Sequence, residues 1–208
     1  MTAASFLKRL QAHAASFAKA VATKEGEWII KGFIDIYRQI YTISVDTKIV
    51  SKVLELLLFP MFAEFAKKNG LDVELCPHQN FYPDLSFIHK RTGNMFAVDI
   101  KSTYRKTATK VNRMTLGAFT GYFRQRDLKK MTCYPYNRYA GHFVLRVIYT
   151  KCEDVADERM IFELEDLRKI PSVIKISPFS YNHNTGSHHG FPVAGTRRTL
   201  GQLLTSIN

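Results

Sequence analysis

Asp84-Leu-Ser-Phe-Ile88 and Met95-Phe-Ala-Val-Asp-Ile-Lys-Ser-Thr-Tyr104 are joined by the connection His89-Lys-Arg-Thr-Gly-Asn94. Both flanking runs are rich in β-branched and aromatic residues, and the connection ends in the turn residues Gly and Asn. This pattern predicts a β-hairpin. Successive side chains of a strand point to opposite faces. Asp99 and Lys101 therefore share one face with Ala97, while Phe96, Val98 and Ile100 point into the core. Asp84 begins the partner strand and is expected to lie close to Asp99.

These three charged residues are the candidate catalytic set. Two facing carboxylates repel one another unless a proton or a cation lies between them, and a few hard oxygen ligands near a phosphate suit Mg²⁺. A lysine two residues from a metal-binding carboxylate can orient an attacking water and stabilise charge that develops on phosphorus. Asp84, Asp99 and Lys101 can therefore hydrolyse a phosphodiester, although a surface ion pair on a hairpin would show the same residues.

The segments around the hairpin predict a mixture of strands and helices. Residues 28–43 are β-branched and aromatic and predict one or two strands. Residues 44–70 predict a long helix that Pro60 kinks or divides. Residues 143–149 form a nearly continuous apolar run, which is typical of a strand buried on both faces. Residues 153–169 are acidic and predict a further helix.

Positive charge is concentrated in one part of the chain. The 208 residues include 30 Lys and Arg against 18 Asp and Glu, a formal net charge of +12. Between residues 85 and 150 there are 13 basic side chains and only two acids, Asp99 and Asp127, and no acid follows residue 166. Aromatic residues are interleaved with these bases. The block is typical of a surface for a polyanion, most simply a nucleic acid, although a solvated basic face has the same composition.

Composition excludes several other classes of protein. The hydrophobic content of 46% excludes disorder as the main state. The longest apolar stretch, residues 53–66, is interrupted by acids and a proline and is too short to cross a membrane. Cys76, Cys133 and Cys152 form no Cys-x-x-Cys pair, and their odd number is a poor framework for disulfides. We therefore expect a reducing compartment, the cytoplasm.

A series of short motifs runs along the chain in a specific order and spacing. In both respects the series resembles the EcoRV-type restriction endonucleases of the PD-(D/E)XK superfamily, over about residues 35–150. The motifs are Ser44-Val-Asp-Thr-Lys48 with Leu54-Glu-Leu56, Gln79-Asn-Phe-Tyr-Pro-Asp84, Ala97-Val-Asp-Ile-Lys-Ser-Thr-Tyr104, Thr115-Leu-Gly117, and Tyr134-Pro135 with Tyr139-Ala-Gly-His142 and Tyr149-Thr150.

The resemblance implies an α/β fold of the restriction-endonuclease type, with a mixed central β-sheet flanked by helices. It also implies a type II restriction endonuclease that hydrolyses double-stranded DNA at a short palindromic site and leaves 5′-phosphate ends. Such an enzyme is a homodimer, uses Mg²⁺ (for which Mn²⁺ can substitute), has no membrane partner and works in a bacterial or archaeal cytoplasm.

The resemblance also assigns roles to individual positions. Asp84 and Asp99 become the metal-binding pair, Lys101 the catalytic lysine, and Glu55 an additional acid in the catalytic and metal site. From the residues alone, Glu55 is either an exposed acid on a helix face or a buried acid with a partner. The residues expected to contact DNA are Lys48, Gln79, Asn80, Ser102, Thr103, Tyr104, Thr120, Arg197 and Arg198.

The C-terminal part of the chain is expected to recognise the DNA sequence. We divide the chain into a catalytic and dimerisation region, residues 1–150, and a recognition region, residues 151–208, which is shorter than in the family. Residues 182–190 and 194–199 compete for the recognition loop, and the second stretch is favoured because Arg197 or Arg198 can make a bidentate contact to guanine. Two alternatives stay open: a structure-selective repair nuclease on the same fold, and a DNA-binding module without catalysis.

Overall fold

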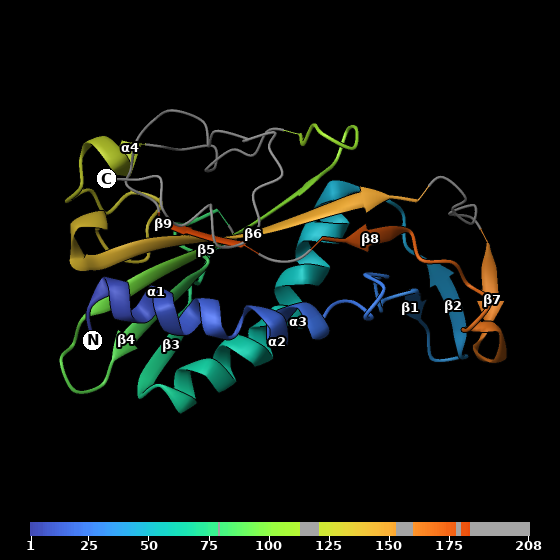
Figure 1. Cartoon of the computed structure of the whole chain (residues 1–208), viewed down its shortest axis with the longest axis horizontal. Helices are drawn as coiled ribbons and strands as arrows, with labels where there is room; N and C mark the ends of the chain where they lie inside the picture. Colours follow the sequence, from blue (N-terminus) through green and yellow to red (C-terminus); the bar gives the residue numbers. More distant parts are fainter. Residues whose placement is uncertain (79, 113–120, 153–159, 178–179, 184–208) are drawn as a thin grey trace.

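A mixed six-stranded sheet forms the centre of the protein (Figure 1). The structure is a computed structural model that describes residues 1–78, 80–112, 121–152, 160–177 and 180–183. The strand order is β3-β4-β5-β6-β8, with β9 also paired to β6, and only the β5–β6 pair is parallel. The predicted α/β class is confirmed. The strands are β3 (Leu71–Leu75), β4 (Leu85–His89), β5 (Met95–Tyr104), β6 (Tyr139–Lys151), β8 (Ile174–Ile176) and β9 (Ser180–His183).

The predicted hairpin is the β4–β5 pair. It is antiparallel, with Leu85 opposite Val98 and Ile88 opposite Met95. Gly93 has a φ of +68° in the connection, a conformation that glycine adopts without the strain that a Cβ causes. The hairpin therefore forms where the sequence predicts it, and its register fixes which side chains of β4 and β5 face each other.

Helices cover one face of this sheet (Figure 1). They are α1 (Ala3–Ala12), α2 (Ala14–Lys19) and α3 (Thr47–Lys68). Asp46 caps α3 by accepting the backbone N–H groups of Lys48 and Ile49. Pro60 lies inside α3 without dividing it, and in Figure 1 the two halves of this helix run in different directions. The main hydrophobic core lies between these helices and the sheet, where Phe6 of α1 stacks on Phe96 of β5.

The opposite face of β5 carries a second, aromatic cluster. Its buried members include Tyr82, Tyr136 and Tyr139, which gather over Ala97. The 3₁₀ helix η1 (Tyr136–Arg138) contributes from the segment before β6, and the short helix α4 (Gly121–Arg124) contributes Tyr122. The two faces of one strand therefore belong to two separate cores.

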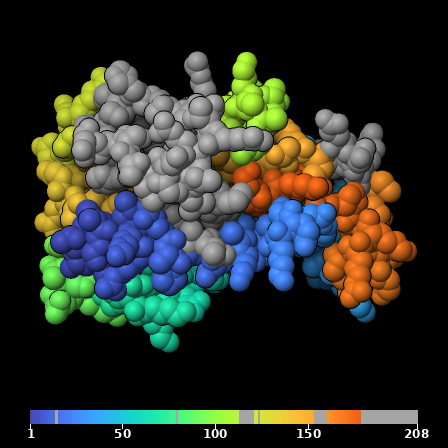
Figure 2. Space-filling model, viewed as in Figure 1, coloured from blue at the N-terminus to red at the C-terminus, as the bar shows by residue number. Residues whose placement is uncertain are grey.

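A small three-stranded antiparallel sheet forms one end of the molecule, with β7 in orange (Figures 1 and 2). It consists of β1 (Gly32–Ile34), β2 (Gln39–Thr42) and β7 (Ile161–Glu163), and the 3₁₀ helix η2 (Leu164–Asp166) follows β7. The helix predicted over residues 153–169 is therefore wrong for residues 160–169. The reason is tertiary: Ile161 and Phe162 pair with β2, and this pairing overrides the local preference of the acidic sequence.

Among the described residues, no helix is both long and apolar enough to cross a bilayer.

Candidate active site

The hairpin register brings the two predicted carboxylates together. Continuing the Leu85–Val98 pairing by one residue places Asp84 opposite Asp99, and opposite residues of an antiparallel pair have Cβ atoms about 5 Å apart. Asp84 is half-buried, and its Oδ2 accepts the backbone N–H of Ile100 at 2.6 Å. Asp99 is only 2% exposed. The spacing of Asp84 and Asp99 in the sequence therefore produces a facing pair at the edge of a buried core.

Lys101 completes this group on the same face of β5. Its Nζ lies 2.7 Å from Oδ2 of Asp99, and its side chain is 22% exposed. This contact places a buried carboxyl oxygen directly beside an ammonium group on one face of β5.

The environment shifts the pKa values of both residues. Burial raises the pKa of Asp99 well above its ordinary value, the neighbouring Asp84 charge raises it further, and Lys101 opposes both effects. Burial lowers the pKa of Lys101, but the charges of Asp99, Asp84 and Glu55 outweigh this effect, so its pKa is raised. Lys101 is therefore protonated at neutral pH, but its single positive charge does not balance the carboxylates around it.

Glu55 lies beside this pair on α3. It lines a cavity together with Asp84 and Ile100. Its carboxylate accepts a hydrogen bond from Lys52 Nζ at 2.9 Å, one turn earlier on the helix. The sequence reasoning did not single out Lys52, although the spacing of three residues is a recognised signal for such a pair.

The donor set fits a divalent cation such as Mg²⁺. The carboxylates of Asp84 and Asp99 are hard oxygen donors, and a dication between them removes the repulsion that raises the pKa of Asp99. Within the ranges described above, no three His, Cys, Asp or Glu side chains are grouped closely enough to hold a metal alone. A metal bound by Asp84 and Asp99 would therefore complete its coordination with water and substrate oxygens, which is how Mg²⁺ is usually bound.

The predicted DNA contacts fall in different surroundings. Lys48 and Asn80 are exposed, and Ser102 and Tyr104 are half-buried. Ser102 Oγ hydrogen-bonds Ser51 Oγ of α3 at 2.6 Å. Thr103 is buried, and its hydroxyl donates to the Asn112 carbonyl. Gln79, Thr120, Arg197 and Arg198 lie outside the described residues. The proximity of these residues to DNA stays a prediction.

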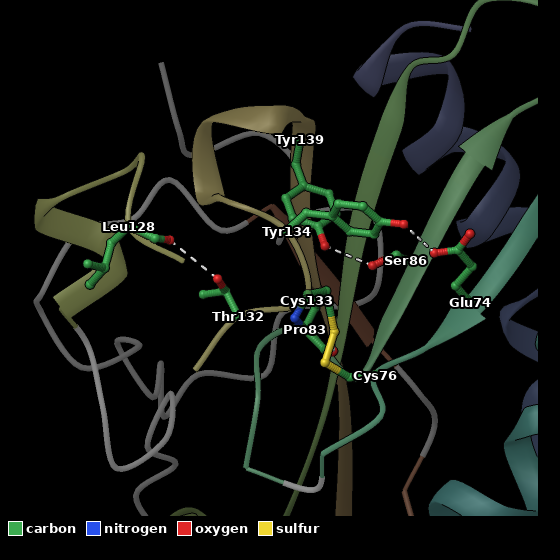
Figure 3. The surroundings of a disulfide bond; sticks show 9 residues. All are labelled: Glu74, Cys76, Pro83, Ser86, Leu128, Thr132, Cys133, Tyr134 and Tyr139. Atoms are coloured by element: carbon green, nitrogen blue, oxygen red, sulfur yellow. Dashed lines mark hydrogen bonds between the residues drawn. A yellow bond between two sulfur atoms is a disulfide. The ribbon is translucent and has the colours of Figure 1, made fainter. Parts of the chain in front are cut away.

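A disulfide next to the site corrects the expectation drawn from the cysteine count. Cys76, just after β3, is joined to Cys133, with their Cα atoms 5.6 Å apart (Figure 3). The Cys133 sulfur also lies 3.7 Å from the carbonyl oxygen of Pro83, immediately before Asp84. The odd count was misleading because only Cys152 is left over as a free thiol. Pairing over 57 residues depends on tertiary structure and leaves no local signal.

Comparisons with known proteins agree with this geometry. The family described as restriction endonuclease EcoRV matches residues 24–183. The type II restriction enzyme EcoRV of Escherichia coli is 29% identical over 157 residues, which are 75% of this chain and 63% of that enzyme. The chain thus spans less than two thirds of the length of this relative. The matched region includes β4, β5 and the segment that carries Cys76 and Cys133.

Proposed function

This chain belongs to the restriction endonuclease EcoRV family, and from that premise we propose that it is a type II restriction endonuclease. Its reaction is the Mg²⁺-dependent hydrolysis of phosphodiester bonds in double-stranded DNA at a short palindromic site, with 5′-phosphate ends. The observation that carries the proposal is the facing pair Asp84 and Asp99 with Lys101 Nζ 2.7 Å from the buried carboxylate. An enzyme of this class needs a pair of metal-binding carboxylates and a lysine ammonium close to one another.

The side chains have separate roles in the proposed reaction. Asp84 and Asp99 would hold the Mg²⁺, and Glu55, which lines the same cavity as Asp84, would be the additional acid. When bound, the metal polarises the phosphoryl group and neutralises its charge. Lys101 orients the attacking water and stabilises negative charge that develops on the phosphoryl oxygens. Attack on phosphorus breaks the bond to the 3′ oxygen, so the phosphate stays on the 5′ end.

The basic block supports DNA as the substrate. Lys106 and Lys110 are exposed just beyond the end of β5, and Arg124, Arg126 and Lys129 are exposed around α4. Cations of this kind attract the phosphates of DNA irrespective of sequence. Sequence recognition is proposed for residues 151–208, most of which lie outside the described residues. We further propose that the enzyme works in the bacterial or archaeal cytoplasm, where its DNA substrate is found.

The small sheet supports a homodimer. Phe33, Ile36, Tyr37 and Ile161 are 53%, 88%, 77% and 53% exposed at one end of the molecule. A monomeric protein rarely exposes so many large apolar side chains together, and a two-fold dimer presents two active sites to the two strands of a palindrome. We therefore assign the dimer contact to the sheet β1-β2-β7, whose strand β7 lies beyond the dimerisation region 1–150 expected from the sequence.

Cleavage of supercoiled plasmid with and without Mg²⁺ tests the proposal. The expected products are discrete fragments, and sequencing their ends gives the site and the cut position. Asp99→Ala should lower the rate by about 10³-fold or more, because the metal loses a ligand. Asp127→Ala is the matched control: it removes the other acid of the basic block, exposed and outside the site, and should cut normally.

Lys101→Ala separates binding from catalysis. The variant should keep its DNA affinity in a gel shift but lose turnover, because its ammonium acts on the attacking water and the developing charge. Cutting without metal, or equal cutting by the Asp99→Ala variant, contradicts the proposed mechanism. DNA binding with no cleavage in any divalent metal would instead identify a non-catalytic binding module.

A further inference from the structure

The corner immediately before Asp84 is held by two buried polar side chains outside the catalytic set. We propose that Tyr82 and His142 are positioning residues that hold the Asp84 carboxylate in its place opposite Asp99. The inference rests on the proposed function, because it concerns the geometry of the same metal site. It identifies which residues outside the metal-binding set control metal affinity.

Tyr82 is anchored at its side chain. It is 4% exposed, and its ring stacks on that of Tyr122 at a centroid distance of 4.8 Å. Its hydroxyl lies 2.9 Å from Nδ1 of His142, whose own side chain is 6% exposed. A buried hydroxyl is costly unless it is hydrogen-bonded, so this contact fixes where the ring can lie.

The second contact of His142 determines the direction of this hydrogen bond. Nε2 of His142 lies 3.1 Å from the carbonyl oxygen of Tyr136, and a carbonyl only accepts. Nε2 therefore carries the proton in the neutral ring, and Nδ1 accepts from the Tyr82 hydroxyl. The imidazole also stacks on the Tyr136 ring at 3.5 Å, with an angle of 6° between the planes. His142 is thus held in one orientation by two hydrogen bonds and a ring contact.

The backbone of Tyr82 is fixed as well. Its N–H donates to the Met131 carbonyl at 3.0 Å, and its carbonyl accepts from the Cys133 N–H at 2.9 Å. Pro83 follows, and its ring restricts the next φ angle. Few rotations therefore separate the anchored Tyr82 from the Asp84 carboxylate, so a shift of Tyr82 moves that carboxylate directly.

The same network reaches the strand that carries the other carboxylate. His142 of β6 pairs in register with Ala97 of β5, two residues before Asp99. Residues two apart on a strand share a face, so His142 and Asp99 border the same aromatic cluster. The hydrogen bond from Tyr82 to His142 thus connects the Asp84 corner to the strands that hold Asp99. A purely apolar cluster needs only the ring of Tyr82; the hydroxyl and the imidazole add a fixed orientation.

The test is a double-mutant cycle with metal binding as the first measurement. The variants are Tyr82→Phe, His142→Phe and their combination, each of which keeps an aromatic ring. Binding of Mn²⁺ alone is followed by the loss of the free-ion EPR signal, and kcat and KM are measured on plasmid. Tyr149→Phe is the matched control, since its hydroxyl is buried in β6 and makes no hydrogen bond in the described structure.

Tyr82→Phe should weaken Mn²⁺ binding about tenfold to a hundredfold, the effect typical of residues that orient metal ligands. It should lower kcat at a fixed metal concentration and leave KM and metal-free DNA affinity unchanged. The double variant should lose no more than the larger single effect, because both changes remove one hydrogen bond. His142→Asn, which restores an acceptor for the Tyr82 hydroxyl, should retain more Mn²⁺ affinity than His142→Phe.

Two results would overturn the inference and can be told apart from failure of the proposed function. Folded Tyr82→Phe protein with unchanged Mn²⁺ affinity and kcat shows that the pair serves packing alone. Fully additive single effects show that the two residues act independently. If the unaltered protein binds no Mn²⁺ and cuts no DNA, the proposed function itself is contradicted, and this inference with it.

Discussion

The two faces of β5 differ in what their side chains contribute. On the face toward α1 and α3, Phe96 and Val98 are completely buried, and Phe6 stacks on Phe96 at 4.5 Å. On the other face, Asp99 is almost as deeply buried but carries a carboxylate, and Lys101 follows it. Burial of the first face removes apolar surface from water and stabilises the folded state. Burial of charge on the second face destabilises the folded state.

The difference shows how this fold can tolerate a catalytic site within its central sheet. A buried carboxylate beside another destabilises the folded state, so the strand that holds it needs support from elsewhere. Here the opposite face of the same ten-residue strand supplies that support. Substitutions on the two faces should therefore change stability in opposite directions. Replacing a buried apolar side chain should lower the stability of the protein. Replacing the buried carboxylate should raise its stability and lower its activity.

The largest effect is expected on the apolar face. Phe96→Ala removes a ring that contacts α1 and should lower the free energy of unfolding by about 3–5 kcal/mol. Unfolding in urea, followed by fluorescence, measures the change. Leu56→Ala, at a side chain that is 64% exposed on α3, is the control and should change the free energy by less than about 0.5 kcal/mol. Equal effects of the two variants would contradict the assignment of the core.

The disulfide is expected to have the next largest effect, because it stabilises the polar face. It joins Cys76 to Cys133 across 57 residues, a span that includes all of β4 and β5. Replacing both residues by Ser should lower the free energy of unfolding of the oxidised protein by about 2–4 kcal/mol. Dithiothreitol should destabilise the unaltered protein but not the double variant.

Cys152→Ser is the control for this experiment, since Cys152 is the free cysteine. Equal stability with and without dithiothreitol would show that the thiols are unpaired in solution. That outcome would agree with the reducing compartment expected from the sequence.

Asp99→Asn should have a smaller effect on stability, and in the favourable direction. The pKa of Asp99 is raised in the folded protein by burial and by Asp84, so the folded state holds more protons than the unfolded one between the two pKa values. Stability from this group is therefore full below the unfolded pKa and is lost as the pH rises through the folded pKa. Asn does not ionise, so the variant should be more stable at neutral pH by about 1–2 kcal/mol.

Urea unfolding of metal-free protein between pH 4 and pH 8 tests this expectation. The two proteins should converge at the acid end and separate as the pH rises. The Asn variant should also lose the stabilisation that Mg²⁺ gives to the unaltered protein, because a ligand that binds only the folded state stabilises it. A gap that closes with rising pH would contradict the raised pKa.

The hairpin and its face assignment were predictable from the sequence, because both follow from local periodicity. The alternation around Asp99 placed it on the opposite face from Val98, and the two residues indeed face separate regions. The facing pair followed from the same register. By contrast, the strand β7 was predicted as helix, since its pairing with β2 connects residues about 120 apart in the chain.

The support around the site was not predictable, because it depends on contacts between distant residues. Tyr82 and His142 are 60 residues apart, and their hydrogen bond exists only after β6 has paired with β5. The motif Tyr139-Ala-Gly-His142 contains His142, but nothing in the motif indicates a role for the imidazole or its partner. The disulfide has the same origin. Local sequence patterns therefore identified the charged residues of the site. The contacts that position these residues are visible only in the tertiary structure.

The smallest effect is expected from Tyr149→Phe, which tests whether a hydroxyl matters on the apolar face. Tyr149 is fully buried in the main core, and its hydroxyl makes no hydrogen bond with the described residues. Removing a buried polar atom without a partner relieves its desolvation cost, so the free energy of unfolding should stay unchanged or rise by up to about 1 kcal/mol.

Tyr82→Phe removes a hydrogen-bonded hydroxyl from the polar face and should lower the free energy of unfolding by about 1 kcal/mol. The two single-atom deletions thus compare the faces of β5 directly, with urea unfolding as the measurement. An equal loss of stability in Tyr149→Phe and Tyr82→Phe would show that both faces depend on polar contacts. That result would contradict the difference between the apolar face and the polar face.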